Sequence, residues 1–297
     1  MSRTVPSRTV AVLGPGGVGG LLAALLSRAG HRVICLAGED TARTLREDGV
    51  RVTSRQYGTF EARVEADTVL REPAGLCLVS VKHGALGAAL ERVPAPLLGD
   101  GLVLPFLNGV DHMAVLRGHF GADRVAAAVI RVESARTAPG VIEHRSPFTD
   151  IDLAGSAERL DPTVALLSAA GTRARVLPDE DAVLWGKLAF LAPFALLTTR
   201  YRLPIGALRT ERRGELVALV EETCAVARAC GGTTGADRVL AGYDGFPADG
   251  RSSMLRDAEA GRPLELDAIG GAVLRAAARH GVPAPVTERL VAELAAG

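Results

Sequence analysis

Lysine and asparagine are scarce in this sequence of 297 residues. Basic residues number 34, as many as the acidic ones, yet lysine occurs only as Lys82 and Lys187. Asparagine occurs once, as Asn108. Because arginine serves wherever a generic surface cation is needed, these three rare residues are candidates for roles that arginine cannot fill. The alternative, that a biased composition leaves a few residues at arbitrary positions, is equally consistent with the counts alone.

Other absences each exclude a class of protein. The net charge is zero, and the sequence contains no run of basic residues. It therefore lacks the basic surface expected of a nucleic-acid-binding protein. The four cysteines form no CxxC pair and no cluster with histidine, so neither a disulfide framework nor a zinc site is indicated. No signal-peptide pattern opens the chain, and the longest apolar run, residues 188–197, is too short to span a bilayer. We therefore expect a cytoplasmic protein without a metal, nucleic-acid or membrane partner, in which this run forms a buried helix.

Length and composition indicate a globular protein of two domains. Apolar residues make up 48% of the chain and charged residues 23%, which is ordinary for a folded protein and excludes disorder. Strand patterns alternate with helical patterns in the first part, whereas helical periodicity takes over from Asp179. We place the boundary near Pro178, so that residues 1–178 form an α/β domain and residues 179–297 a helical domain.

The α/β part opens with a strand–turn–helix–strand unit. Apolar and β-branched residues predict a buried strand at Thr9–Leu13, a helix over residues 21–29 and a second strand at Arg32–Leu36. A G-x-G-x-x-G motif stands between the first strand and the helix, where glycines permit a tight turn and a close approach of the backbone to a pyrophosphate. The sequence therefore predicts a dinucleotide site made by Gly14, Pro15, Gly16, Gly17, Val18 and Gly19.

The residues after the second strand leave the choice of dinucleotide open. Glu39 stands where an acid binds the ribose hydroxyls of NAD, while Arg43 could reach the 2′-phosphate of NADP. Both residues are equally ordinary charges for the beginning of a solvated helix. NAD and NADP therefore both remain candidates on these residues.

Lys82 and Asn108 directly follow two further predicted strands. The remaining strand patterns lie at residues 75–81, 102–106, 124–132 and 173–177. Their alternation with helical stretches predicts a doubly wound sheet, and ligands of such sheets bind beyond the carboxyl ends of the strands. Both residues are thus placed to meet a cofactor. The alternatives are a loop-tip charge for Lys82 and an ordinary Asn-Gly turn at Asn108.

Lys187 is the one charge in the middle of a long apolar helix predicted over residues 181–199. Burying an ammonium group is costly unless it is paired, and burial lowers the pKa of a lysine toward a value useful for proton transfer. Arginine cannot release its proton under the same conditions. The residue therefore fits a proton donor. The alternative is a lysine whose ammonium group reaches the surface of the helix.

Polar residues also mark the beginnings of two short helices near the C-terminus. Ser252 or Ser253 opens the first, and Glu265 and Asp267 lie in the first turns of the second. Serine suits a helix N-cap and acids suit the helix dipole, so each residue has an ordinary structural explanation. Only their occurrence together with Lys187 indicates a site.

These motifs together resemble the ketopantoate reductases (2-dehydropantoate 2-reductases) over nearly the whole chain. The matching segments, in chain order, are Gly14–Gly19, Val81-Lys82, Leu107-Asn108-Gly109, residues 139–144, Trp185-Gly186-Lys187-Leu188, residues 252–255, Glu265-Leu266-Asp267 and residues 280–283. The resemblance implies an N-terminal Rossmann-type domain, an all-helical C-terminal domain of the 6-phosphogluconate-dehydrogenase-like type, and catalysis in the cleft between them. It also implies an NADP-dependent reduction of 2-dehydropantoate to (R)-pantoate, as in pantothenate biosynthesis, and a homodimer.

The resemblance further implies a role for each matching residue. Lys187 would polarise the 2-oxo carbonyl group and protonate the developing alkoxide, and Glu265 would bind the substrate hydroxyl group. Ser253 would contact the substrate, while Lys82 and Asn108 would lie beside the nicotinamide and the substrate. These roles agree with the chemistry, because hydride that arrives at carbon builds negative charge on oxygen, which a cation or an acid must stabilise.

The chain departs from the family pattern at three places. Gly38 stands where an arginine commonly binds the NADP phosphate, so NAD stays an alternative cofactor. Leu191 and Ala195 stand where asparagines are common on the catalytic helix, and Gly270 replaces another. A more apolar wall suggests a more hydrophobic 2-oxo acid, as for a D-2-hydroxyacid dehydrogenase, or a secondary-metabolite ketone. A third interpretation, a non-catalytic nucleotide-binding sensor, is disfavoured because the lysine and the glutamate are both retained.

Overall fold

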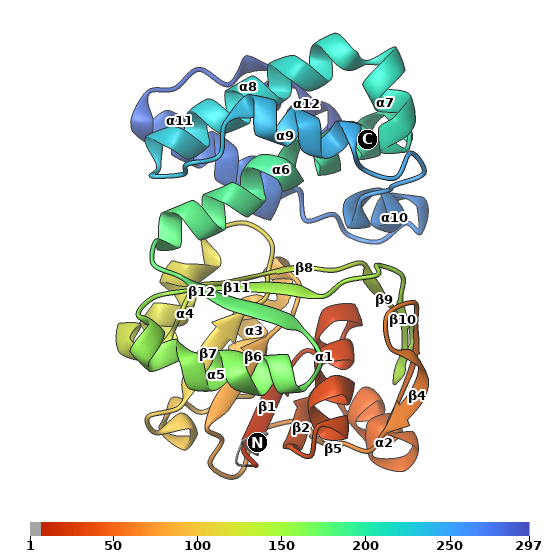
Figure 1. Cartoon of the computed structure of the whole chain (residues 1–297), viewed down its shortest axis with the longest axis vertical. Coiled ribbons are helices and arrows are strands. Elements are labelled where there is room, and N and C mark those ends of the chain that lie inside the picture. The colour runs from red at the N-terminus through yellow and green to blue at the C-terminus, as the bar shows by residue number, and fades with distance from the viewer. Residues whose placement is uncertain (1–6, 297) are drawn as a thin grey trace. The chain divides into compact units, whose positions relative to one another are not determined.

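The computed structural model describes residues 7–296 and divides the chain into two compact units (Figure 1). The first unit holds the chain up to Leu107 together with His112–Glu180. The second unit holds Asn108–Asp111 and the chain from Asp181 onward. A four-residue segment from the early part of the sequence therefore belongs to the later, helical unit.

The first unit is built on a five-stranded parallel sheet in the order β5-β2-β1-β6-β7. The side chains of β1 and β6 are buried almost throughout, as expected for central strands covered on both faces. Helix α1 packs between this sheet and a second, smaller sheet. The elements are β1 (Thr9–Leu13), α1 (Gly17–Arg28), β2 (Arg32–Leu36), α2 (Glu39–Asp48), β5 (Glu65–Asp67), β6 (Leu76–Val79), α3 (Leu86–Leu90), β7 (Leu102–Pro105) and α4 (His112–Phe120), with short 3-10 turns at His83–Ala85, Ala95–Leu98 and Ala122–Arg124.

Two smaller sheets complete the first unit, and the sequence did not predict them. The four-stranded sheet has the order β4-β3-β10-β9 and the three-stranded sheet the order β12-β11-β8. The predicted strands at residues 124–132 and 173–177 exist, but they pair with β11, and their link to the parallel sheet is the isolated bridge between Val125 and Val103 of β7. The elements are β3 (Val50–Ser54), β4 (Gly58–Ala62), β8 (Ala128–Arg131), β9 (Ser134–Ala138), β10 (Val141–His144), β11 (Asp150–Ala154), α5 (Ala157–Ala169) and β12 (Arg173–Leu177).

The second unit is helical, which confirms the predicted fold class of a Rossmann-type sheet domain and an all-helical domain. Its core consists of the apolar faces of α6, α8, α9 and α11, and α6 is its longest helix (Figure 1). A short π-helical turn, η4, precedes α11. The elements are α6 (Glu180–Tyr201), α7 (Ile205–Glu211), α8 (Arg213–Ala229), α9 (Ala236–Asp244), α10 (Ser253–Glu259), η4 (Asp267–Gly271), α11 (Ala272–His280) and α12 (Pro285–Ala296).

Helix α6 is longer than the apolar run that predicted it. Among the helices of residues 7–296 it is the one whose length and composition would allow it to cross a bilayer. However, 72% of its most apolar window is buried inside the protein, as in the core helix of a globular unit. The expected buried helix is therefore present, although it spans 22 residues.

Candidate functional site

The glycine loop between β1 and α1 has a geometry that only glycine allows at several positions. Gly14 has a φ of +84°, and a Cβ atom there would lie 2.5 Å from the Val81 side chain. A Cβ atom at Gly17 would lie 2.3 Å from the carbonyl oxygen of Ser134, and one at Gly19 would lie 2.4 Å from the carbonyl oxygen of Gly14. The first turn of α1 therefore packs closely on the strand ends around it.

The same loop leaves its outer side open. At Gly16, which is the N-cap of α1, a Cβ atom would meet nothing closer than 4.0 Å, and no side chain caps the helix. Because no side chain caps α1, the backbone N–H groups of its first turn are left for a ligand to satisfy, as at helix beginnings that bind an anionic pyrophosphate. Pro15 is buried and Val18 packs on the core, so these two residues shape the loop. The residues predicted from the motif therefore fit a dinucleotide.

Two serines that the sequence analysis missed hold this loop. Ser80 Oγ donates a hydrogen bond to the carbonyl oxygen of Gly14 at 2.8 Å, and Ser134 Oγ donates to that of Gly17 at 2.7 Å. Ser80 directly follows β6 and lies two residues before Lys82, which is exposed at the beginning of a 3-10 turn. The position of Ser80 next to the Val81-Lys82 motif was the available signal, whereas nothing in the sequence indicated Ser134.

In the second unit, Lys187, Asn108 and Glu265 form one chain of hydrogen bonds. Lys187 Nζ donates to Asn108 Oδ1 at 3.1 Å, and Asn108 Nδ2 donates to Glu265 Oε2 at 3.0 Å. All three side chains are half-buried. The two neighbours fix the carboxamide orientation, because an ammonium group needs an acceptor and a carboxylate needs a donor. The structure thus brings together three residues that are far apart in the sequence.

Backbone and ion-pair contacts hold the Asn108 segment in the second unit. Gly109 has a φ of +83°, and a Cβ atom there would lie 2.2 Å from the carbonyl oxygen of Ala268 in η4. Arg275 of α11 donates to the carboxylate of Asp111 at 2.7 Å and to that of Asp267 at 2.6 Å. Arg275 thereby joins the segment that carries Asn108 to the turn that follows Glu265, and the sequence analysis did not find it.

The face of α6 that carries Lys187 continues with apolar side chains. Residues four and eight positions further along a helix lie near the same face, and here they are the half-buried Leu191 and the buried Ala195. Three turns beyond the lysine, the hydroxyl group of Thr198 is hydrogen-bonded to that of Ser252 at 2.7 Å. Ser252 is the N-cap of α10, so Ser253 is the first residue of that helix, and its side chain is exposed.

His144, within the matching segment of residues 139–144, serves the structure of the small mixed sheet. Ser54 Oγ accepts hydrogen bonds from two backbone N–H groups, so its own proton is donated to His144 Nδ1 at 2.8 Å. His144 Nε2 therefore carries a proton and faces Ser146 Oγ at 2.9 Å and the carbonyl oxygen of Phe148 at 3.2 Å. Burial lowers the pKa of His144, and the Phe148 carbonyl group opposes that effect. The imidazole is thus held as the neutral Nε2–H tautomer.

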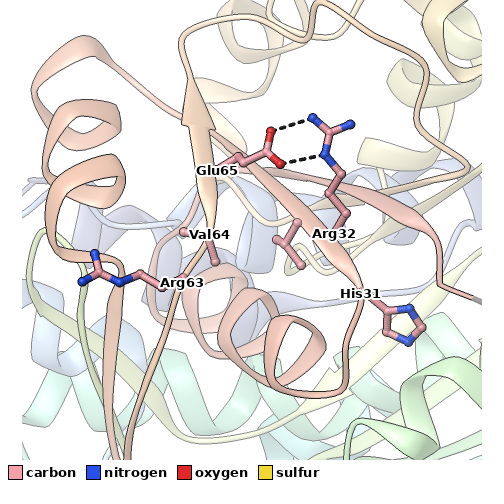
Figure 2. Close-up of a pocket in the computed structure, with 6 residues that line it drawn as sticks. His31, Arg32, Arg63, Val64 and Glu65 are labelled. Atoms are coloured by element: carbon pink, nitrogen blue, oxygen red, sulfur yellow. Dashed lines mark hydrogen bonds and ion pairs between the residues drawn. The ribbon is translucent and has the colours of Figure 1, made fainter.

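A cavity of about 260 Å³ lies at the amino ends of β2 and β5, and Figure 2 shows residues that line it. His31, Arg63 and Val64 line it, together with Arg32, which forms an ion pair with Glu65. Ligands of open parallel sheets bind at the carboxyl ends of the strands, so this cavity lies at the opposite edge from the glycine loop. Among residues 7–296, no cluster of His, Cys, Asp and Glu side chains could hold a metal ion.

A Rossmann-type sheet domain joined to a helical domain is the fold of the ketopantoate reductase class of oxidoreductases. The family model "Ketopantoate reductase PanE/ApbA" matches residues 10–154, and the model for its C-terminal domain matches residues 180–297. The chain therefore belongs to the ketopantoate reductase PanE/ApbA family, as the motifs predicted.

Known proteins of similar sequence and structure agree with this assignment. The 2-dehydropantoate 2-reductase of Caulobacter vibrioides is 29% identical over 295 residues, which cover 96% of this chain and 98% of that protein. The crystal structure of 2-dehydropantoate 2-reductase from Geobacter metallireducens is similar with a TM-score of 0.88 at 29% identity, covering 96% and 98% of the two chains. A structure of D-mandelate dehydrogenase with NADH and anilino(oxo)acetate shares the fold, with a TM-score of 0.89 at 19% identity and 97% of each chain covered.

Proposed function

We propose that the protein reduces the carbonyl group of a 2-oxo acid, with 2-dehydropantoate as the first candidate and (R)-pantoate as its product. The observation that carries this proposal is the hydrogen-bonded chain of Lys187, Asn108 and Glu265. Membership of the family and the names of its relatives support the substrate. The glycine loop Gly14–Gly19 and Lys82 would hold the dinucleotide, which supplies the hydride when it is bound.

Each residue of the chain has a step that suits its chemistry. The ammonium group of Lys187 would stabilise the negative charge that develops on the substrate oxygen. It would then donate a proton to that oxygen. Asn108 Oδ1 accepts one N–H of the ammonium group and so fixes the direction of the other two. The Glu265 carboxylate accepts from the Asn108 amide through Oε2, and because a carboxylate accepts several hydrogen bonds it would also accept one from a substrate hydroxyl group. Ser253, on the neighbouring helix α10, is the proposed additional contact to the substrate.

NADPH is the proposed reductant and NADH the alternative. A spectrophotometric assay of the purified protein with a panel of 2-oxo acids, each with NADPH and with NADH, tests substrate and cofactor together. Turnover of 2-dehydropantoate with NADPH above all other combinations is the expected result. Tight nucleotide binding without turnover of any 2-oxo acid would contradict the proposal and favour a nucleotide sensor. A homodimer is also proposed, which the molar mass from light scattering tests.

A second candidate substrate is a bulkier, more hydrophobic 2-oxo acid, such as an arylglyoxylate. The observation that favours it is the apolar wall that Leu191 and Ala195 form beyond Lys187 on α6. Polar contacts make a site strongly selective for a hydroxylated substrate over one that lacks the hydroxyl group. A wall without hydrogen-bonding groups does not provide this selectivity. The variants Leu191→Asn and Ala195→Asn decide between the two candidates. If 2-dehydropantoate is the substrate, neither substitution should raise the ratio of kcat/KM for 2-dehydropantoate to kcat/KM for the aryl compound.

A further inference from the structure

Arg92 places its guanidinium group at the carboxyl ends of β2 and β5. Its Nη1 donates to the carbonyl oxygen of Ala37 at 2.9 Å and to that of Thr68 at 2.8 Å. Arg92 lies just beyond α3 and is half-buried, so it reaches the end of β2 across 55 residues of sequence. The side chain is therefore fixed in place by the backbone of two neighbouring strands.

The charge of Arg92 is not neutralised by a carboxylate, in contrast to the arginines of the adjacent helix. On α2, Arg46 pairs with Glu39 at 2.8 Å and Arg43 pairs with Asp40 at 2.7 Å. Within residues 7–296, Arg92 forms no ion pair, and its hydrogen bonds use Nη1 alone. A guanidinium group with donors to spare is a ready partner for a phosphate, to which it can donate two parallel hydrogen bonds.

This guanidinium group lies where a dinucleotide-binding sheet recognises the adenosine ribose. The end of β2 adjoins the glycine loop, because the N–H of Gly14 donates to the carbonyl oxygen of Leu36 at 3.1 Å. In such sheets an arginine near this strand end accommodates the 2′-phosphate of NADP. Gly38, one residue beyond Ala37, has no atom within 4 Å of the place where a Cβ atom would lie. Arg92, from the segment after α3, can thus supply the cation that position 38 does not.

We propose that Arg92 binds the 2′-phosphate group of the dinucleotide and thereby makes the protein selective for NADPH. The proposal rests on the dinucleotide site of the proposed function, and it holds whichever 2-oxo acid is reduced. The acids Glu39 and Asp40 do not repel the phosphate strongly, because each is already paired with an arginine.

Calorimetric titration of the full-length protein with adenosine 2′,5′-bisphosphate and with adenosine 5′-monophosphate tests this without any turnover. The wild-type protein should bind the bisphosphate at least about tenfold more tightly than the monophosphate, as expected for charge-assisted hydrogen bonds. The variant Arg92→Gln removes the charge and the Nη1 donor of the guanidinium group but keeps a polar side chain. It should bind the two nucleotides within about twofold of each other, with its affinity for the monophosphate unchanged.

The control variant is Arg71→Ala, which removes an exposed arginine paired with Asp67 near the same strand end. It should keep the preference for the bisphosphate. An equal loss of affinity for both nucleotides in Arg92→Gln would show that Arg92 merely supports the strand ends. A wild-type protein that prefers the monophosphate would also overturn the proposal. Failure to bind either nucleotide would overturn both this proposal and the dinucleotide site, whereas absent turnover with intact binding would overturn the proposed function alone.

Discussion

Asn108 and Glu265 are hydrogen-bonded across 157 residues of sequence, with Asn108 Nδ2 donating to Glu265 Oε2 at 3.0 Å. The other end of the same carboxamide accepts from Lys187 Nζ. Asn108 thus links a cation and an anion through hydrogen bonds. It lies in a four-residue segment that belongs to the helical unit. The single asparagine of the chain occupies a position where both a donor and an acceptor are needed on one short side chain.

Replacing that carboxamide should impair turnover more than folding. In Asn108→Asp a second carboxylate would face Glu265, and the like charges would separate the two groups. We expect kcat to fall by about 100-fold in Asn108→Asp and by at least about tenfold in Asn108→Ala, as for lost positioning of a proton donor. Steady-state kinetics with the preferred 2-oxo acid measure this.

The matched control removes a carboxamide elsewhere. Gln56 accepts a hydrogen bond from Thr149 in the first unit, and Gln56→Ala should keep kcat. If Asn108→Asp turned over as fast as the wild type, the hydrogen-bonded chain would have no part in the reaction.

Gly109 should tolerate no side chain. Its φ of +83° and the 2.2 Å approach of a Cβ atom to the Ala268 carbonyl oxygen mean that Gly109→Ala must shift the Asn108 segment away from η4. We expect a loss of about 1–3 kcal/mol in the free energy of unfolding and a fall in kcat of more than about tenfold. Denaturant titration and steady-state kinetics check the two effects.

Gly118→Ala provides the comparison, because Gly118 lies in α4 with open space around it. This variant should keep kcat and should gain a few tenths of a kcal/mol, since alanine favours a helix. Equal behaviour of the two variants would show that the close approach at Gly109 has no consequence.

The buried His144 should make stability depend on pH. Burial holds its pKa below the ordinary value of 6.5 in the folded state. Below about pH 6.5 the unfolded chain therefore takes up a proton that the folded protein does not, so the free energy of unfolding falls as pH decreases through this window. The loss stops once pH passes below the lower, folded-state pKa.

Substitution of His144 isolates this contribution. His144→Gln should lower the free energy of unfolding by about 1–3 kcal/mol at neutral pH, because buried partners lose their hydrogen bonds, and it should also reduce the slope below pH 6.5. Denaturant unfolding across a pH series measures both. His119→Gln, at an exposed histidine of α4, should leave the slope as it is. A slope unaltered by His144→Gln would rule out His144 as its source.

The sequence predicted those parts of the structure that depend on local patterns. The strands β1 and β2 have the predicted bounds, and the glycine loop stands between β1 and α1 as expected. Lys187 was found because a charge inside an apolar helix is unusual. These signals are contained in short windows of sequence, where burial on both faces produces continuous apolar runs.

The remaining parts depend on contacts between distant segments. The strands β8 and β12 were found, but their pairing with β11 was not, because the pattern of a strand does not identify its neighbour. The short strand β3 alternates buried and exposed residues, including a charged one, and was missed. Arg92 and Arg275 looked like two ordinary arginines of a chain that uses arginine everywhere. Only the fold shows what their guanidinium groups contact.

The most direct test of the role of Lys187 is the rate at which the variant Lys187→Arg reduces the preferred 2-oxo acid. The rate is measured from the decrease in absorbance of the reduced nucleotide. Arginine keeps the positive charge at this point of α6 but cannot donate its proton. We expect turnover to fall by at least about 100-fold, while Lys187→Arg binds the nucleotide as tightly as the wild type. A rate for Lys187→Arg close to that of the wild type would contradict the assignment of Lys187 as the proton donor.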